Sequence, residues 1–251
     1  MLKMIEPQKR IVLIIQPYLF RNSFILKELP INDLNILKKY AQSEVRRRGE
    51  ILFREGAFPK GAYWLVSGKV KICQGTEAGQ RQTHYIYSDE DLIGYRQLIA
   101  EEPNPVTAVL LEDSTVNFIP AETFRGLLKT SPVFARNVLS ALASEFSVWM
   151  NRMTGFKKFS VRHRLVLTLL ILYVQYQRSG LPEGLITMTR TELAEYVGAT
   201  LETVVRSLNK LKANKLVQIN GRRIQVLNPN AMIDILSEEK KDKNKTIIHD
   251  T

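Results

Sequence analysis

The sequence T-R-T-E-L-A-E-Y-V-G-A-T-L-E-T-V-V-R-S-L-N-K-L, residues 189–211, carries the start and stop signals of two short helices. Thr189 and Glu192 have the spacing of a capping box, in which each side chain bonds a backbone amide near the helix start. Gly198 stands where the chain must turn at left-handed dihedral angles, and Thr200 is the expected N-cap of a following helix. The stretch therefore predicts a helix, a tight turn and a second helix.

The apolar positions indicate which face of each helix is buried, because they recur at helical spacing. The predicted inward-facing residues are Leu193, Ala194, Val197, Val204, Leu208 and Leu211. The predicted outward-facing residues of the second helix are Leu201, Glu202, Val205 and Arg206. This arrangement is typical of a helix-turn-helix that binds DNA. The alternative is an ordinary helical hairpin whose Glu202 and Arg206, four residues apart on one face, form a surface ion pair.

Two short β-like runs follow the second helix. They are Leu216–Ile219 and Arg223–Leu227, joined around Asn220-Gly221, a pair typical of a type I′ hairpin turn. A basic hairpin directly after such a helix is expected to be the wing of a winged helix-turn-helix, with Arg222 and Arg223 available for phosphates. The alternative is a hairpin that serves only to pack.

The charge distribution agrees with a nucleic-acid partner. The chain has 251 residues and a net charge of +11, which attracts polyanions in general. Residues 160–230 hold 10 Lys and Arg against 4 Asp and Glu, so basic charge is densest around the predicted DNA-binding element. Neutralising phosphates in this way makes binding sensitive to salt.

Composition argues against a secreted or membrane protein. Cys73 is the only cysteine, so no intrachain disulfide can form. The apolar run Ile11–Ile15 is too short for a signal-peptide core, and Leu165–Val174 is about half the length of a membrane span. The sequence predicts a cytoplasmic protein.

The N-terminal half has a different pattern. Between Arg48 and Ile119, short apolar runs alternate with glycines at positions 49, 56, 61, 68, 75, 79 and 94. Short strands at such spacing predict an antiparallel roll or jelly roll. Residues 17–44 are expected to be mainly helical, with an apolar stripe of Leu26, Leu29, Leu34 and Leu37.

A long helix is predicted from Pro132 to about Phe156. Apolar residues recur along it with alternating spacings of four and three, as in a two-stranded parallel coiled coil. This heptad seam comprises Ala135, Leu139, Leu142, Phe146, Trp149, Met153 and Phe156. The residues from Leu139 onward are the predicted dimer interface, and the alternative is a helix packed only on its own domain. A second line, Phe134, Val138 and Ala141, is available for that internal packing.

These elements predict an α+β chain with four parts. They are N-terminal helices with an effector-sensing roll (residues 1–130), a long dimerisation helix and hinge (131–159), a winged helix-turn-helix (160–237) and a disordered tail (238–251). The hinge is expected at Phe159-Ser160-Val161, before another helix from Val161 to Gln177.

In this order of elements the chain resembles the CRP/FNR superfamily of bacterial transcription regulators. The matching segments are G-E-I-L-F-R-E-G (49–56), Y-W-L-V-S-G-K-V-K-I (63–72), D-L-I-G (91–94), V-R-H-R-L (161–165) and the helix-turn-helix. The resemblance implies a homodimer with a cyclic-nucleotide-binding-like roll, in which a bound effector reorients the DNA-binding domains. It also implies RNA polymerase as a further partner, at a surface that varies within the family.

The resemblance also implies which residues contact DNA. Glu202 and Arg206 occupy the positions that read a TGA-type half-site, where arginine is the usual partner of guanine and glutamate accepts from cytosine. Leu201 stands where FNR-type regulators have an aliphatic residue, which predicts a TTGA-type half-site, and Val205 is a further candidate for thymine methyl contacts. The expected phosphate contacts are Thr189, Arg190, Thr191, Thr200 and Thr203.

The expected effector region departs from that of cyclic-AMP-binding relatives. The residues implied for this pocket are Gly94, Tyr95, Arg96, Gln97, Val106 and Thr107. They lack the family's glutamate for the ribose and its Arg-Ser pair for the phosphate, and only Arg96 offers a charge-assisted anchor. Cyclic AMP is therefore not the expected effector. An iron–sulfur cluster needs four cysteines, and haem is not expected at Cys73 or His84. No cofactor is predicted.

No enzyme is predicted either. The three histidines, His84, His163 and His249, are scattered, whereas a metal-dependent jelly-roll enzyme needs clustered ligands. His163 is expected to be a solvated or capping residue. Two other functions stay open at the level of sequence: a ligand sensor that acts mainly through protein contacts, and a cyclic-nucleotide-responsive activator.

Overall fold

The computed structural model describes residues 6–75, 81–177 and 185–237. Contacts divide the chain into two compact units, Phe20–Ser147 and the combination of Met1–Leu19 with Val148–Thr251. This division differs from the boundaries predicted at residues 130 and 159. The segment that ends at Leu19 groups with the C-terminal unit, and the long helix continues from one unit into the other. The predicted disordered tail, 238–251, lies outside the described residues, as do Gly79 and His249.

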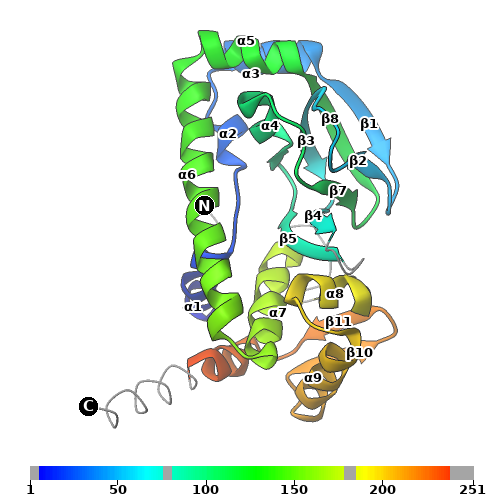
Figure 1. Ribbon diagram of the computed structural model, residues 1–251. Helices are drawn as coiled ribbons and strands as arrows, with labels where there is room; N and C mark the ends of the chain where they lie inside the picture. The colour runs from blue at the N-terminus through cyan, green and yellow to red at the C-terminus, as the bar shows by residue number, and fades with distance from the viewer. Residues whose placement is uncertain (1–5, 76–80, 178–184, 238–251) are drawn as a thin grey trace, which may run out of the picture. The chain divides into compact units, whose positions relative to one another are not determined.

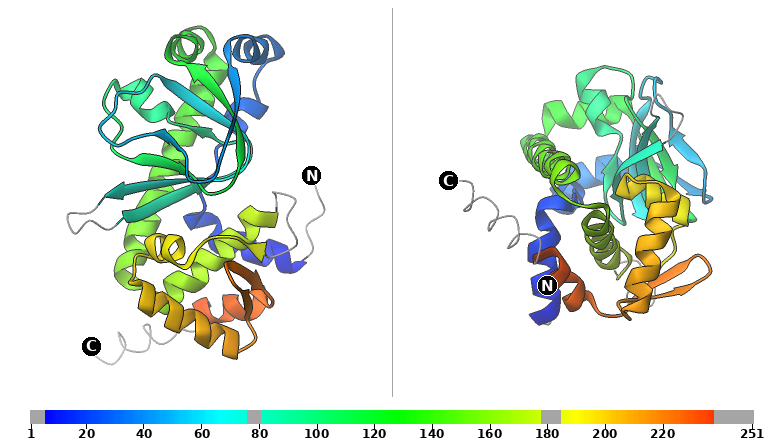
Figure 2. Two further views of the ribbon diagram at one scale, coloured as in Figure 1. Left: turned by 90° about the vertical axis from the view of Figure 1, so that its right-hand side faces the viewer. Right: turned by 60° about the horizontal axis from the view of Figure 1, so that its bottom comes forward.

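The Phe20–Ser147 unit is built around two antiparallel sheets (Figures 1 and 2), which confirms the predicted roll. One sheet has the strand order β1-β8-β3-β6 and the other β2-β7-β4-β5. The strands are β1 (Gln42–Arg46), β2 (Ile51–Phe53), β3 (Gly61–Ser67), β4 (Val70–Gly75), β5 (Arg81–Tyr87), β6 (Leu92–Ile93), β7 (Thr107–Leu110) and β8 (Ser114–Pro120).

Two of the predicted turn glycines show why the roll needs glycine. Gly68, between β3 and β4, has a φ of 118°, and a Cβ atom there would lie 2.0 Å from the Ser114 hydroxyl oxygen. Gly61 begins β3 at its close approach to β8, where a Cβ atom would lie 2.2 Å from the Ile119 carbonyl oxygen. A side chain would clash with the Ser114 side chain at Gly68 and with the backbone of β8 at Gly61.

Helices cover the β1-β8-β3-β6 sheet of this unit. They are α2 (Phe24–Lys27), α3 (Ile31–Tyr40), α4 (Tyr95–Ala100), α5 (Ala121–Thr130) and the first part of α6 (Pro132–Lys158). Phe134, Val138 and Ala141 of α6 are buried in the core beneath them, which confirms the second apolar line. The ring of Phe134 meets Phe124 of α5 edge-on, with centroids 5.3 Å apart.

The predicted helical region 17–44 is broken into short pieces. A 3-10 turn, η1 (Gln16–Tyr18), precedes α2, Pro30 starts α3, and the strand β1 already begins at Gln42. Only Leu26 and Leu37 of the predicted stripe are fully buried, whereas Leu29 and Leu34 are partly exposed. The stripe is interrupted because proline cannot continue a helix from the preceding turn.

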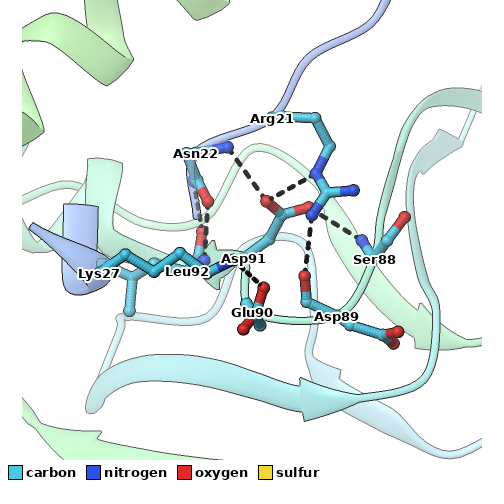
Figure 3. A network of polar contacts seen from close by, with 8 residues as sticks. All are labelled: Arg21, Asn22, Lys27, Ser88, Asp89, Glu90, Asp91 and Leu92. Atoms are coloured by element: carbon cyan, nitrogen blue, oxygen red, sulfur yellow. Dashed lines mark hydrogen bonds and ion pairs between the residues drawn. The ribbon is translucent and has the colours of Figure 1, made fainter. Parts of the chain in front are cut away.

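The segment before α2 is held to the loop between β5 and β6 by a buried polar network (Figure 3). The Asp91 carboxylate accepts hydrogen bonds from Arg21 Nε at 3.2 Å, from the Asn22 amide at 3.0 Å and from the Ser88 amide at 2.9 Å. The Asn22 side chain bonds both backbone groups of Leu92, at 2.8 Å each. Asn22 thereby pairs with β6, an edge strand of its sheet, as a neighbouring strand would.

The second unit contains the predicted winged helix-turn-helix. It comprises α1 (Glu6–Ile15), η1, the end of α6, α7 (Val161–Gln177), β9 (Leu185–Ile186), α8 (Arg190–Val197), α9 (Leu201–Ala213), β10 (Val217–Asn220), β11 (Arg223–Val226) and a final helix over 229–237. The break between α6 and α7 falls at Phe159-Ser160, which confirms the predicted position.

Helix α7 is the central helix of this unit. All residues from Leu165 to Tyr176 are buried, and α1, α8 and α9 pack against the helix. Its continuous apolar run is therefore that of a core helix. Among the described residues, no helix combines the length and the hydropathy needed to cross a bilayer.

Candidate DNA-binding surface

The two short helices form as predicted, and each begins with a side-chain cap. The Thr189 hydroxyl oxygen accepts from the Glu192 amide at 3.1 Å, and the Glu192 carboxylate accepts from the Thr189 amide at 2.7 Å. The turn follows at Gly198, with a φ of 68°. The Thr200 hydroxyl oxygen then accepts from the Thr203 amide at 3.3 Å and so starts α9.

The buried and exposed faces of the two helices also agree with the sequence. All six predicted inward-facing residues are buried, together with Tyr196, whose place in the core the sequence pattern did not identify. Leu201 is 47% exposed, Glu202 and Arg206 are exposed, and Val205 is half-buried. Within the described part of the chain, Glu202 and Arg206 form no ion pair, so the side chains of both stay available on the outer face.

The outer face of α9 extends further than predicted. A shallow hollow along the helix is lined by Leu201, Glu202, Val205, Arg206, Asn209, Lys210 and Ala213 (Figure 1 shows α9 beside the hairpin β10–β11). Asn209 and Lys210 were missed by the sequence reasoning. Their spacing of four residues from Val205 and Arg206 was the signal that places them on this face.

The predicted phosphate contacts differ in their surroundings. Thr191 and Thr200 are exposed, whereas Thr189 and Thr203 are half-buried beside their caps. The Arg190 guanidinium donates to the Gly221 carbonyl oxygen at 3.0 Å and so links the start of α8 to the tip of the wing. Burial lowers the pKa of Arg190, and its Nη1 atom is enclosed by protein. Its contact with DNA phosphate stays a prediction.

The wing forms, but its turn is not the predicted type. Asn220 pairs with Arg223, so Gly221 and Arg222 are the two central residues of the turn. Gly221 has a φ of 55°, whereas Arg222 does not have a positive φ, and a type I′ turn needs positive φ at both positions. The prediction of a type I′ turn is therefore wrong, and the turn is centred at Gly221-Arg222, one residue later than the predicted Asn220-Gly221. Arg222 and Arg223 are exposed, as expected.

A third strand completes the wing sheet. Strand β9, absent from the sequence-based prediction, pairs antiparallel with β11 through Ile186 and Ile224. The resulting strand order is β10-β11-β9. A two-residue strand has too little alternation to be recognised in a sequence.

The residues implied for the effector pocket lie on two segments of the roll. Gly94 caps α4 with a φ of 80°, and Tyr95 is fully buried at the first position of that helix. Val106 precedes β7, and Thr107, its first residue, accepts from the Glu55 amide at 3.1 Å. Arg96 Nη1 donates to Glu145 of α6 at 2.8 Å. The one cationic anchor that the sequence offers is thus bound to a carboxylate of the same unit.

Glu145 is a residue that the sequence analysis did not single out. It is 4% exposed and continues the buried line of Phe134, Val138 and Ala141 on α6. The Tyr95 hydroxyl lies 3.4 Å from its carboxylate and donates to it. Burial raises the pKa of Glu145, and the charge of Arg96 offsets part of that rise. The signal in the sequence was a single acidic residue in a line of otherwise apolar residues along one face of the helix.

The heptad seam is exposed over much of its length. Leu139 and Phe146 are each 66% exposed, Met153 is 45% exposed, and Met150, which was not predicted, is 50% exposed. Leu142, Trp149 and Phe156 are partly buried. A row of large apolar side chains on one helix face is unusual for a surface that stays in water.

The candidate ligands for haem or metal have structural contacts. Cys73 is buried, with its sulfur 3.6 Å from the Thr107 carbonyl oxygen, and His84 Nε2 lies 3.4 Å from the Gln74 amide oxygen. His163 lies at the start of α7, 2.6 Å from the Ser160 hydroxyl and 2.9 Å from the Ile235 carbonyl oxygen. Over the ranges that the structure describes, no three His, Cys, Asp or Glu side chains are grouped to hold a metal ion.

Two family models match the two halves of the chain. Residues 44–131 match the cyclic nucleotide-binding domain, and residues 163–235 match the Crp-like helix-turn-helix domain. These ranges correspond to the roll and to the winged helix-turn-helix, so the predicted resemblance is confirmed for both.

Curated relatives and solved structures agree with these matches. The fumarate and nitrate reduction regulatory protein of Vibrio cholerae is 26% identical over 78% of this chain and 79% of its own length. The anaerobic regulatory protein of Haemophilus influenzae is 25% identical over 86% of this chain and 84% of its own.

Among solved structures, FixK2 from Bradyrhizobium japonicum superposes with a TM-score of 0.68 at 21% identity, over 77% of this chain and 96% of that one. The c-di-GMP-responsive regulator CLP of Xanthomonas campestris superposes with a TM-score of 0.66 at 22% identity, over 78% of this chain and 99% of that one.

The curated relatives are transcription regulators and not enzymes. With its roll, its long helix and its winged helix-turn-helix, the chain belongs to the CRP/FNR family of transcription regulators.

Proposed function

We propose that this regulator is a homodimer that binds a palindromic TTGA-type DNA site. The observation that carries the proposal is the outer face of α9, where Glu202 and Arg206 are exposed directly after the capped helix start. The first residues of a recognition helix are those that reach base edges in the major groove. RNA polymerase is the proposed protein partner at the bound promoter.

The side chains of this face match the chemistry of the proposed half-site. The Arg206 guanidinium suits the O6 and N7 acceptors of guanine, and Glu202 suits the amino group of cytosine. Leu201, which is 47% exposed, offers an apolar contact for a thymine methyl group. The Vibrio cholerae relative is a fumarate and nitrate reduction regulatory protein, which supports the resemblance to FNR-type regulators from which the TTGA-type half-site is proposed.

The dimer is proposed on the heptad seam of α6. Its exposed members, Leu139, Phe146 and Met153, with Met150 beside them, form an apolar row that a second copy of the helix would cover. A two-fold dimer also matches a palindrome, because each copy then meets one half-site.

We further propose that the effector of this regulator is not cyclic AMP. The bond of Arg96 to Glu145 supports this, because a cyclic phosphate would have to compete with a buried carboxylate for the guanidinium. We also propose that neither an iron–sulfur cluster nor haem is bound: a cluster needs four cysteines where the chain has only Cys73, and the Cys73 sulfur already contacts the Thr107 carbonyl oxygen. A regulator of chromosomal genes acts in the bacterial cytoplasm, and we extend the proposal to that location.

The test is a comparison of Arg206→Ala with wild type on labelled duplexes, measured by fluorescence anisotropy. Wild type is expected to prefer a TTGA palindrome over one with the guanine exchanged. Arg206→Ala is expected to lose about 10-fold or more of that preference per half-site, because a bidentate arginine–guanine pair contributes roughly 1–3 kcal/mol.

Lys212→Ala is the matched control, because it removes the same charge from an exposed position of the same helix. It should weaken binding to both duplexes equally. Full discrimination by Arg206→Ala would contradict the proposed reading of the half-site.

A further inference from the structure

Arg164, in the first turn of α7, contacts two separate segments of the second unit. Its Nε donates to the Val197 carbonyl oxygen at 3.0 Å, and Nη2 donates to that of Gly198, also at 3.0 Å. Its Nη1 donates to the carbonyl oxygens of Phe156 at 3.2 Å and Phe159 at 3.3 Å. All four acceptors are backbone groups, so the guanidinium bridges pieces of main chain.

The acceptors lie at the ends of two helices. Phe156 is in the last turn of α6, and Val197 and Gly198 end α8, immediately before the turn into α9. The last four carbonyl groups of a helix have no partner within the helix, and the helix dipole makes that end attractive to a cation. Arg164 therefore supplies hydrogen-bond donors to carbonyl groups at the C-terminal ends of both α6 and α8.

A second arginine connects α6 to α8 at this junction, next to a small cavity. Arg152 of α6 stacks on the Tyr196 ring of α8 at 4.5 Å and donates to its hydroxyl at 2.8 Å. Beside the two arginines is a cavity of about 30 Å³. That space is the size of a water molecule or two, so the bonds of the two arginines connect α6 to α8 beside a gap in the packing.

We propose that Arg164 is a positioning residue that sets the orientation of the recognition helix α9 relative to the end of α6. Only two residues lie between Gly198 and the first residue of α9, Leu201, so fixing the Gly198 carbonyl fixes the start of that helix. If α6 joins two copies, this orientation also sets the separation of the two recognition helices. The consequence for half-site spacing rests on the proposed function, whereas the orientation within one chain does not.

The first test measures the orientation without DNA. Spin labels are placed at exposed positions of α6 and α9 by Thr154→Cys and Asn209→Cys, in a Cys73→Ser background. The labelled chain is diluted with unlabelled protein, so that pulsed electron paramagnetic resonance reports the distance within one chain. A narrow distribution is expected with Arg164, and one at least twice as wide with Arg164→Ala. An unchanged width would overturn the proposal.

Two variants separate positioning from charge and from general folding. Arg162→Ala removes an exposed arginine from the same helical turn and should leave the distribution narrow. Arg164→Lys keeps the charge, but an ammonium group cannot span four carbonyls as the planar guanidinium does, so broadening is expected here too. If Arg164→Ala does not fold by circular dichroism, the Arg164→Lys distribution decides, and a wild-type width would overturn the proposal.

The second test uses DNA. Wild type is expected to prefer one spacing of the two half-sites by at least 10-fold over spacings changed by one or two base pairs. Arg164→Lys should reduce that preference to 3-fold or less and keep the base preference at each half-site. The spin-label distances could broaden in the Arg164 variants while wild type shows no preference for palindromes. That result would contradict the proposed function and leave the positioning role supported. Retained spacing preference in Arg164→Lys would count against the positioning role.

Discussion

Glu145 shows how one residue can connect the roll, at the residues proposed for its effector pocket, to the long helix. Its carboxylate lies in a line of otherwise apolar residues, and it accepts from Arg96 and Tyr95, the two residues that follow Gly94. Burial raises the pKa of Tyr95, with the charge of Glu145 adding to the rise, so the hydroxyl stays protonated as a donor. These two bonds join the start of α4 to α6.

Glu145→Gln is expected to change how stability depends on pH. Burial holds the pKa of Glu145 above its usual value, so between the unfolded and folded pKa values the folded chain binds more protons. The contribution of Glu145 to the free energy of unfolding therefore falls as pH rises through that window, and the variant lacks this fall. Urea unfolding of both proteins from pH 7 to pH 4 measures the difference.

Wild type is expected to gain stability relative to Glu145→Gln as pH is lowered through the window. Glu122→Gln, at an exposed carboxylate of α5, controls for the change in net charge. A wild type that loses stability relative to Glu145→Gln on acidification would contradict the account.

At the scale of the element, α6 has two apolar faces with separate roles. The line of Phe134, Val138 and Ala141 is buried in the roll, whereas Leu139 and Phe146 of the heptad seam are each 66% exposed. The first line is already covered within the chain. Only the second is available to another copy.

Phe146→Glu is therefore expected to weaken the proposed dimer and leave the fold of the chain intact. A phenylalanine side chain contributes roughly 1.5–3 kcal/mol on burial, and a two-fold interface loses it twice while burying two carboxylates. We expect a rise of about 100-fold or more in the dimer dissociation constant, measured by sedimentation equilibrium. Ser140→Glu, exposed on α6 outside the seam, should leave association unchanged. Equal association of Phe146→Glu and wild type would remove the seam as the interface.

The molecule as a whole carries a net charge of +11, and its basic residues are densest in the DNA-binding half. Each phosphate contact releases counterions, so affinity falls with salt in proportion to the number of contacts. In a dimer every contact occurs twice. The slope of log affinity against log salt therefore reports the number of phosphate contacts made by the whole dimer rather than by one chain.

Arg222→Ala is expected to lower the slope of log affinity against log salt by about two, one for each wing of a dimer. The position is exposed at the tip of the wing, outside the face of α9 that is proposed to read bases. Titrations between 50 and 200 mM salt on one palindrome and on one unrelated duplex measure the slope. The loss should be the same on both duplexes. A loss confined to the palindrome would mean that Arg222 reads sequence.

The helix-turn-helix could be predicted almost residue by residue, because its determinants are local. The capping box of Thr189 and Glu192, the turn at Gly198 and the cap at Thr200 involve partners no more than four residues apart. The heptad period of α6 and the turn glycines of the roll are equally local. Predictions were less accurate where proline broke a pattern, as at Pro30, or where a strand was too short to alternate, as in β9.

The sequence alone determined that two helices, a wing, a long amphipathic helix and a roll would form, because each depends on spacings within a few residues. The tertiary structure decided how they are joined. Asn22 bonds Leu92 across 70 residues, Arg96 bonds Glu145 across 49, and Arg164 bonds Gly198 across 34. A contact between a polar side chain and a partner that is distant in the sequence leaves no periodic pattern from which it could be predicted. Its role follows only once the fold has brought the two groups together, where burial makes leaving either one unpaired costly.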